Sequence, residues 1–441
     1  MLYKLPSDFK KKKRVKWLKG IGKVTAYLLP DKTEIDVPVY QGVNTIVFGI
    51  TGSGKSYSYT LPAAKTLLAH VPGMKGVFFE IKNSFVNGCF KAGDKIITFD
   101  PESVQDKNSL FKWCMVKEIR QARNSEAEMM KIATFLFGDM LLGANQNLGW
   151  IKAARNTLIG VLRVIIDCSL DNTTNWTLVN ALRHMKTKEI LAYLARHPRN
   201  HSLLTKDFSY DVNNPTDYMP TRRAEDIMFF FNQVLEEFAG TFESDGQDTI
   251  HDFLHTDGQN LFIMYDLASA EISRSFILYF LKKIKDEKMS HTSNIKAPIL
   301  FCLDEIDKMS DGGKPADFGL FQAATLGREY GLQILLTTQS IENLYGCAPE
   351  FNSHITRGGM AGFPIVLSFR PGDSETIETL QTLYGSKYIE HIEIPMSRCE
   401  CVRKRYNWEP IVSDTDFAEL GTGECYIKIK DCLPQKVQFY I

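Results

Sequence analysis

The residues with the clearest chemical meaning lie between positions 49 and 56. They read Gly-Ile-Thr-Gly-Ser-Gly-Lys-Ser, which fits the phosphate-loop pattern Gly-x-x-x-x-Gly-Lys-Ser at every position. Glycines allow backbone amides to approach phosphate oxygens with no Cβ between them. We expect this loop to bind ATP, with Lys55 on the β- and γ-phosphates and Ser56 on Mg²⁺. The nucleotide-binding residues predicted here are Gly49, Thr51, Gly52, Ser53, Gly54, Lys55 and Ser56.

Two adjacent carboxylates, Asp304 and Glu305, follow the apolar run 299–303. In a nucleotide site, Asp304 would help to hold the Mg²⁺ and Glu305 would polarise the attacking water. The alternative is an ordinary strand end with a solvated acidic cap, which such a pair more often is when it occurs alone. The phosphate loop in the same chain favours the catalytic interpretation.

Two further polar residues, Arg328 and Gln339, flank the apolar run 332–338. Gln339 would lie at the carboxyl end of a strand, which is the ligand edge of a doubly wound sheet, and could sense the γ-phosphate or orient water. Arg328, at the end of a probable helix, could act as a finger in a neighbouring subunit's site. On spacing alone, a surface arginine and a strand cap are the simpler interpretations.

Metal-ligating residues give a weaker signal. Nine cysteines are scattered without a short-spaced framework, an odd number that suits a reducing cytosol. A zinc site built from the last four of them is the less favoured alternative to buried or idle thiols, because Cys-x-Cys is not a usual zinc spacing. His251 and His255 are one helical turn apart, and we favour a helix surface over a ligand pair. The four cysteines in question are Cys399, Cys401, Cys425 and Cys432.

Composition and charge argue against a broadly basic nucleic-acid binder, a secreted protein and a chain that spans the membrane by itself. The chain has 441 residues, 44% of them hydrophobic and 24% charged, and its formal net charge is zero, so any contact with DNA must be local. No run of 18 apolar residues occurs, and the first ten residues lack a signal-peptide core. We expect peripheral attachment to a membrane at most. The basic segment 10–19 is either a membrane or nucleic-acid arm or a solvated terminus.

The apolar pattern indicates the elements that would position these residues. Short apolar runs alternate with helical segments, which predicts a parallel sheet covered on both faces. Residues 23–39 predict two strands with a turn at 30–32, and residues 425–441 predict a closing pair of strands. Helical spacing dominates 103–242, which predicts a mostly helical insertion, with a polar loop at 200–220. The apolar runs are 44–48, 76–81, 95–99, 260–265, 299–303, 332–338 and 364–369, and the helical segments in the insertion are 118–140, 150–167, 177–195 and 222–238.

From about residue 42 onward, these motifs resemble the coupling ATPases of type IV secretion and conjugation, the TraG/TraD-like group of the FtsK/HerA superfamily. Residues 79–82, Phe-Glu-Ile-Lys, are similar to that family's strand ending in Asp-Pro-Lys-Gly, although Glu80 and Asn83 stand where Asp and Gly are usual. The other segments that carry the resemblance are 49–56, 93–101, 108–110, Trp150 with Ala154 and Arg155, 303–306, 327–340 and 373–376.

The resemblance implies a RecA-like P-loop domain with an inserted all-α domain and a hexameric ring with nucleotide at subunit boundaries. It would make Arg328 the arginine acting in trans and Gln339 the γ-phosphate sensor. We divide the chain into an N-terminal arm and strand pair (1–41), a first part of the nucleotide-binding domain (42–102), an all-α insertion (103–242) and a second part (243–441). The membrane-spanning N-terminus common in the family is missing, so we expect it to have been removed or to be supplied by a partner.

Three functions follow as hypotheses. The first is an ATP-driven motor, at the inner face of the cell membrane, that couples relaxase-bound DNA to the membrane-bound channel proteins. The second is the same motor acting on protein effectors. The third is a nucleotide-gated docking scaffold with little turnover, against which the complete motifs argue. The sequence does not separate the first two.

Overall fold

The computed structural model describes residues 19–143, 147–167, 173–241, 246–267, 270–310, 317–347, 360, 362–393 and 403–440. The chain divides into two compact units. The first comprises Met1–Cys89, Ala297–Ser310 and Leu320–Ile441, and the second comprises Phe90–Lys296 and Asp311–Gly319. Each is described separately below.

Five parallel strands form the centre of the first unit. β3 (Thr45–Phe48) lies between β9 (Ile365–Ser368) and β8 (Leu332–Thr338), and β7 (Ile299–Asp304) lies between β8 and β4 (Lys75–Glu80). Every residue of these strands is buried. Both faces of the sheet are covered, so the sequence of these strands shows continuous apolar runs and does not alternate between apolar and polar residues.

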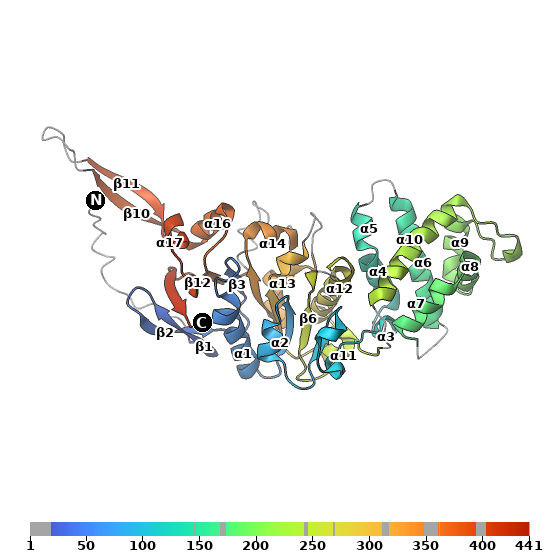
Figure 1. Ribbon diagram of the computed structural model, residues 1–441, viewed down its shortest axis with the longest axis horizontal. Helices are drawn as coiled ribbons and strands as arrows, with labels where there is room; N and C mark the ends of the chain where they lie inside the picture. Colours follow the sequence, from blue (N-terminus) through green and yellow to red (C-terminus); the bar gives the residue numbers. More distant parts are fainter. Residues whose placement is uncertain are drawn as a thin grey trace. The chain divides into compact units, whose positions relative to one another are not determined.

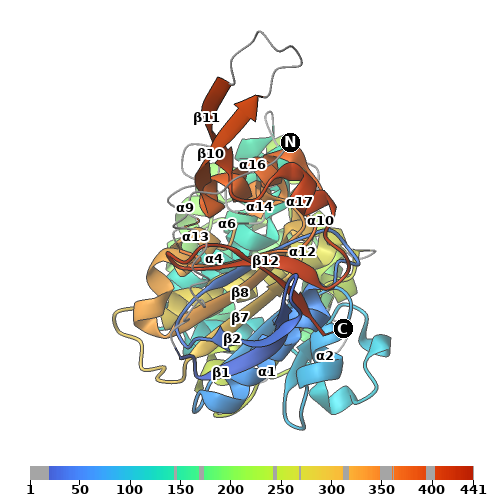
Figure 2. The same cartoon turned by 90° about the vertical axis from the view of Figure 1, so that its left-hand side faces the viewer.

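Antiparallel strands extend this sheet beyond β9. β12 (Glu424–Ile429) pairs with β9, β13 (Gln435–Phe439) pairs with β12, and β1 (Gly22–Leu28) lies between β13 and β2 (Thr33–Val39). The predicted N-terminal strand pair and the predicted closing pair are both present and hydrogen-bonded to each other (Figure 2).

A separate two-stranded antiparallel ribbon, β10 (Ser386–Glu393) and β11 (Arg403–Pro410), reaches away from the large sheet (Figures 1 and 2). The sequence interpretation did not assign it. The helices of this unit are α1 (Leu61–His70), α2 (Ser84–Cys89), α13 (Leu320–Leu326), α14 (Ile341–Cys347), α16 (Ser374–Tyr384) and α17 (Asp414–Ala418).

The second unit contains a parallel pair of strands and a set of helices. β5 (Lys95–Ile97) pairs with β6 (Leu261–Met264), which α11 (Ile250–His255) precedes and α12 (Ala270–Lys288) follows. Between the two strands, the described residues 115–241 form only helices and their connections. These are α3 (Met115–Gln121), α4 (Ser125–Leu136), α5 (Gly138–Gly143), α6 (Leu148–Asp167), α7 (Asn175–His184), α8 (Thr187–Leu194), α9 (His201–Phe208) and α10 (Arg222–Thr241).

Three details of the helical prediction were wrong. The segment 118–140 is divided among α3, α4 and α5. The first break follows from Asn124, whose side chain accepts the N–H of Ala127 and caps α4, which begins at Ser125. The segment 177–195 is divided between α7 and α8. The polar segment 200–220, predicted as a loop, begins with α9, whose Leu204 and Phe208 are buried four residues apart on one helix face.

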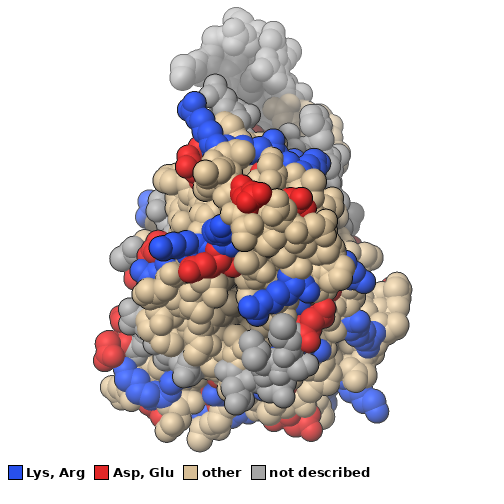
Figure 3. All heavy atoms as spheres, turned by 90° about the vertical axis from the view of Figure 1, so that its right-hand side faces the viewer, with Lys and Arg blue, Asp and Glu red and all other residues tan. Residues whose placement is uncertain are grey.

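The α/β fold class is confirmed, with a sheet of parallel strands and an all-helical segment inserted between β5 and β6, whereas the division of the chain at residues 42, 103 and 243 stays a prediction. Among the described residues, no helix is both long enough and apolar enough to cross a membrane. On the face drawn in Figure 3, basic and acidic side chains are interspersed, with uncharged surface between them. That distribution agrees with a net charge of zero, which gives no broad field of one sign.

Candidate functional site

The phosphate loop begins where β3 ends, at the carboxyl edge of the parallel strands. The N–H of Gly49 donates to the carbonyl of Thr338 at 3.2 Å, and that of Ile50 donates to the carbonyl of Arg370 at 2.9 Å. These bonds attach the loop to the ends of both strands that flank β3. The loop is therefore held at the sheet edge where doubly wound folds bind ligands.

One side of the loop is packed and the other is open. Gly54 has a φ of +97°, and a Cβ there would lie 3.2 Å from the backbone nitrogen of Gly423. Gly423, just before β12, also donates its N–H to the carbonyl of Ser53 at 3.0 Å. By contrast, a Cβ on Gly52 would meet no atom within 4 Å. The antiparallel extension thus braces the loop from behind, a contact that no sequence motif had indicated.

The helix after the loop starts with a π-helical turn, Ser56–Thr60, which runs directly into α1. The N–H of Leu61 donates to the carbonyl of Ser56, five residues earlier. The next residue, Pro62, has no N–H to donate to the preceding turn. The wider π-helical turn therefore loses no hydrogen bond at this position. The amides of this turn face the loop as the first turn of a helix.

The Lys55 side chain is folded onto its own loop. Its ammonium donates to the carbonyls of Gly49 and Ile50, in the second case at 3.0 Å, and the side chain is only 4% exposed. The nearest carboxylate oxygen, Oε1 of Glu305, is 3.9 Å away. Burial lowers the pKa of Lys55, and Glu305 and Asp304 oppose that shift. The ammonium is close to carboxylates without being paired tightly with any.

The two residues predicted to hold Mg²⁺ lie together. The Ser56 hydroxyl donates to both carboxylate oxygens of Asp304, at 3.3 and 3.2 Å. The Thr337 hydroxyl, from the neighbouring strand β8, also donates to Asp304. Burial raises the pKa of Asp304, and the bond from Thr337 opposes the rise. A hydroxyl and a carboxylate so placed are hard oxygen ligands that suit Mg²⁺.

Glu305 is held in an unusual backbone conformation between two ammonium groups. Its φ is +55°, in the left-handed region that non-glycine residues seldom adopt. Its N–H donates to the Thr337 hydroxyl at 3.0 Å, which fixes this turn to β8. Its carboxylate lies 3.6 Å from the ammonium of Lys82 and 3.9 Å from that of Lys55. Lys82 belongs to the motif at 79–82 but was not among the predicted site residues.

The atypical residues of that motif have a structural explanation. The Glu80 carboxylate is fully buried and accepts the N–H groups of Phe85 and Val86 at 2.7 and 2.8 Å, so it caps α2. Burial raises its pKa to about 7, against the effect of these hydrogen bonds. Asn83 adopts a φ of +56°, a left-handed conformation that asparagine tolerates better than most residues other than glycine. Glu80 therefore supports the turn that presents Lys82.

Gln339 reaches the loop, and Arg328 does not. The Gln339 side-chain amide donates to the Thr51 hydroxyl at 3.0 Å. Arg328 is exposed in the 3₁₀ turn Gly327–Tyr330, which precedes β8, whereas Gln339 follows β8. The seven residues of β8 separate them by roughly 20 Å along the strand direction. Within this chain, Arg328 is thus at the opposite edge of the sheet from the loop, beside Gly42.

One carboxylate near the site was missed. Asp307, two residues after Glu305, is 4% exposed, and its carboxylate oxygens make no hydrogen bond of normal geometry. Burial raises its pKa to about 6, although the nearby Asn343 side chain lowers that pKa slightly. No sequence pattern marks it, because its burial depends on how the turn after β7 packs.

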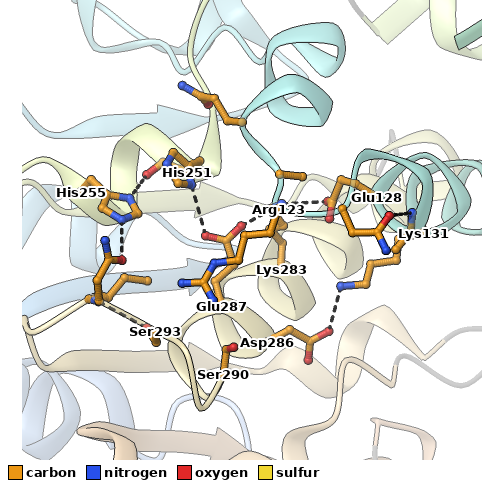
Figure 4. A pocket seen from close by; sticks show the side chains of 16 residues that line it. Arg123, Glu128, Lys131, His251, His255, Lys283, Asp286, Glu287, Ser290 and Ser293 are labelled. Atoms are coloured by element: carbon orange, nitrogen blue, oxygen red, sulfur yellow. Dashed lines mark hydrogen bonds and ion pairs between the residues drawn. The ribbon is translucent and has the colours of Figure 1, made fainter. Parts of the chain in front are cut away.

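The candidate metal ligands remain apart from this site. Cys399 and Cys401 lie outside the described residues, and Cys425 is buried in β12. The part of the chain that the structure describes contains no cluster of three or more His, Cys, Asp or Glu suited to a metal. His251 and His255 lie on α11 in the second unit, with ring centroids 4.2 Å apart. They border a polar cavity of about 240 Å³ (Figure 4). The basic segment falls outside the described residues, Lys19 excepted.

Comparison with known proteins gives a consistent result. The family model for the type IV secretion-system coupling protein DNA-binding domain matches residues 37–438. No curated protein matches the sequence. The fold is similar to the bacterial conjugative coupling protein TrwBdeltaN70 in an unbound form, at 17% identity and a TM-score of 0.63, with 91% of this chain and 86% of that chain covered. TrwB in complex with ADP and Mg²⁺ gives the same values, and TrwB with the non-hydrolysable ATP analogue ADPNP differs only in an identity of 18%.

Proposed function

Because this chain belongs to the family of type IV secretion-system coupling proteins, we propose that it is an ATP-driven motor that couples relaxase-bound DNA to the channel of a conjugative system. The family model is that of a DNA-binding domain, which supports DNA as the cargo. Binding of ATP with Mg²⁺, hydrolysis and translocation are parts of this proposal.

The observation that carries the proposal is the meeting of Ser56 and Asp304 beside Lys55, at the open side of the loop. The donor set fits a magnesium nucleotide. An ammonium and the backbone amides can take phosphate oxygens, while a hydroxyl and a carboxylate can take the cation. The open space at Gly52 is where a phosphate can approach the backbone without meeting a side chain.

Each residue then has a distinct task. When nucleotide binds, the Lys55 ammonium moves its hydrogen bonds from the carbonyls of Gly49 and Ile50 to phosphate oxygens. The buried positive charge then has negatively charged partners in place of neutral ones. Ser56 and Asp304 hold the cation. Glu305 accepts a proton from the attacking water. Gln339 senses the γ-phosphate through its hydrogen bond to Thr51 in the loop. When bound, ATP with Mg²⁺ supplies the β–γ phosphoanhydride bond whose hydrolysis drives the motor.

The position of Arg328 supports a ring. Arg328 lies across the sheet from its own loop, where it is placed to reach another subunit's site, so we propose a homo-hexamer in which Arg328 completes the neighbouring pocket. We propose peripheral attachment at the inner face of the membrane, with relaxase and the channel proteins as partners.

The test is the ATPase rate per subunit, measured over a wide range of protein concentration with no DNA, single-stranded DNA or duplex DNA. We expect the specific rate to rise with concentration, because the site needs a neighbour, and to rise again with DNA. A rate that is independent of both concentration and DNA would contradict the motor on DNA. If relaxase or an effector protein alone raised the rate, the protein-cargo hypothesis would be favoured.

A mixing experiment isolates the role of Arg328. Arg328→Ala should bind ATP as the wild type does and lose about 10³- to 10⁵-fold in rate, the usual scale for an arginine finger. Lys55→Ala should also be inactive. A mixture of the two should recover activity, because some interfaces pair an intact loop with an intact arginine. Arg328→Lys is the matched control, because it keeps the positive charge but lacks the planar guanidinium, and so separates the effect of charge from that of the arginine geometry. No recovery in the mixture would indicate that Arg328 acts within its own subunit or only in assembly.

A further inference from the structure

Three aromatic side chains are exposed on the β10–β11 ribbon. Tyr388 is 50% exposed, Tyr406 49% and Trp408 71%. Tyr388 lies directly opposite Trp408 in the register, and Tyr406 is two residues from Trp408 on the same strand. Side chains two apart on a strand share a face, so all three are on one side of the ribbon, which we call the aromatic face.

The three rings contact one another. The ring centroids of Tyr388 and Tyr406 are 5.5 Å apart and their planes differ by only 6°. Tyr388 and Trp408 are 5.2 Å apart. The Tyr406 hydroxyl donates to the Glu390 carboxylate at 3.1 Å, which orients that ring. Exposed aromatic area of this kind on a projecting ribbon is typical of a surface that binds a partner.

We propose that the aromatic face stacks against the bases of single-stranded DNA, an inference that rests on the proposed function. A single strand alternates flat bases with charged phosphates, and proteins that bind it combine aromatic platforms with basic residues. β11 has this composition, since Arg403, Lys404 and Arg405 directly precede Tyr406 in the same strand. Bases stack on such rings whatever the sequence, which suits a motor that must pass any DNA.

The helix α16 lies between the segment after Gln339 and the base of the ribbon. Two residues after Gln339, the N–H of Ile341 donates to the Thr376 hydroxyl in the first turn of α16, at 2.8 Å. At the other end of α16, the carbonyl of Gly385 accepts the N–H of Ile411 at 2.9 Å and closes the base of the ribbon. These two hydrogen bonds attach one end of α16 to the segment after Gln339 and the other end to the base of the ribbon.

The test compares binding of the full chain to two fluorescent single strands of equal length, one of thymidines and one of abasic sites. Both carry the same phosphates, so only the first can stack. Trp408→Ala should weaken binding to the thymidine strand about 5- to 100-fold, the range found for loss of one base–aromatic stack, with little change for the abasic strand. Trp408→Phe, which keeps a ring, should retain most of the affinity. The salt dependence should be unchanged, because no phosphate contact is removed.

Phe229→Ala is the matched control, because Phe229 is an aromatic residue that is 65% exposed but lies on α10 in the second unit. It should bind both strands as the wild type does. If Trp408→Ala and Tyr406→Ala keep wild-type affinity for the thymidine strand while DNA still stimulates hydrolysis, the aromatic face is not a base contact and the proposed function stands. If the wild-type protein neither binds DNA nor responds to it, the proposed function itself fails.

Two other occupants would also overturn the inference. If Trp408→Ala dissociates the ring, as measured by sedimentation, without changing affinity for the thymidine strand, the face is a contact between subunits. If the same variant loses binding to anionic phospholipid vesicles with no effect on DNA, the face is a membrane contact, for which tryptophan and tyrosine are also suited.

Discussion

Two buried lysines in this protein have opposite surroundings. In the first unit, Lys55 donates to backbone carbonyls, and its nearest carboxylate oxygen is 3.9 Å away. In the second unit, Lys283 lies 2.8 Å from the carboxylate of Glu287 and 2.9 Å from that of Glu128 (Figure 4). It also lies 3.6 Å from the carboxylate of Glu118. Both side chains are nearly inaccessible, at 4% and 3%.

The carboxylates around Lys283 also accept hydrogen bonds from neutral donors. Tyr279 donates its hydroxyl to Glu128 at 2.6 Å, and Trp113 donates its indole N–H to Glu118 at 3.2 Å. Glu118 accepts the N–H of Ile250 at 2.7 Å as well. A buried ion pair is tolerable when each member has its hydrogen bonds, and this cluster meets that condition.

The difference teaches how to separate a ligand site from a structural cluster. Near Lys55, the Asp307 carboxylate makes no hydrogen bond of normal geometry and Glu305 is held in a left-handed conformation. Incomplete pairing costs stability, and it persists where a ligand completes the set. The Lys283 ammonium is paired with three carboxylates, although a cavity borders the cluster, so we assign the cluster to holding α3, α4, α11 and α12 together.

The largest expected effect is that of Lys55→Ala on hydrolysis. We expect the ATPase rate to fall to background, by at least about 10³-fold, because loss of one cation that stabilises phosphoryl transfer acts on this scale. Thermal stability should change little, since the ammonium has no tight carboxylate partner to lose. Steady-state ATPase assays and a melting curve of the same preparation check both halves. Hydrolysis at the wild-type rate would show that the site is wrongly assigned.

Glu305→Gln should separate binding from chemistry. The amide keeps the shape of the side chain but cannot accept a proton from water, so we expect a loss of about 10²- to 10⁴-fold in turnover. Nucleotide affinity, measured by fluorescence with a labelled ATP analogue, should stay near the wild-type value. Asp307→Asn serves as a control that alters a nearby buried carboxylate. If Glu305→Gln loses affinity and shows no separate chemical defect, Glu305 is structural.

Lys283→Met tests the other side of the comparison. Removal of the Lys283 ammonium, which lies among three carboxylates, leaves uncompensated buried charge, and we expect a loss of about 3 to 5 kcal/mol in the free energy of unfolding. Urea denaturation measures this. The protein that remains folded should bind nucleotide normally. A stable variant with defective nucleotide binding would remove the distinction between the two clusters.

The smallest expected effect is a pH dependence of stability from Glu118. Burial raises its pKa to about 7 in the folded protein, while Lys283 opposes the rise, and the unfolded chain has a value near 4.5. Between these values the folded state binds more protons than the unfolded state, so the stability from this group is present below pH 4.5 and is lost as the pH rises to 7. The loss is roughly 3 kcal/mol.

Glu118→Gln should flatten this part of the pH profile of unfolding. Glu80, whose pKa is also raised to about 7, contributes a dependence of the same sign and should remain visible in that variant. An unchanged profile would show that Glu118 is ionised in the folded protein throughout this range.

Local patterns that depend on neighbours in the chain were predicted well. The apolar runs of β3, β7 and β8 were found because a strand buried on both faces needs continuous apolar residues. Helical spacing was found within 103–242 because apolar residues that share one helix face recur every three or four positions. Breaks within helices were missed, because a cap such as Asn124 changes only one or two residues of a periodic pattern. The β10–β11 ribbon was missed because its alternation is irregular and its face is exposed.

The sequence by itself determined the phosphate loop and the carboxylate pair, because each is a contiguous segment whose chemistry depends on residue types at fixed spacing. Only the tertiary structure decided which side chains meet. It placed Ser56 on Asp304, 248 positions away in the chain, and Gly423 behind the loop. It also put Arg328 at the far edge of the sheet. Such contacts follow from strand order, and strand order is set by the packing of the whole sheet, which no local run of residues encodes.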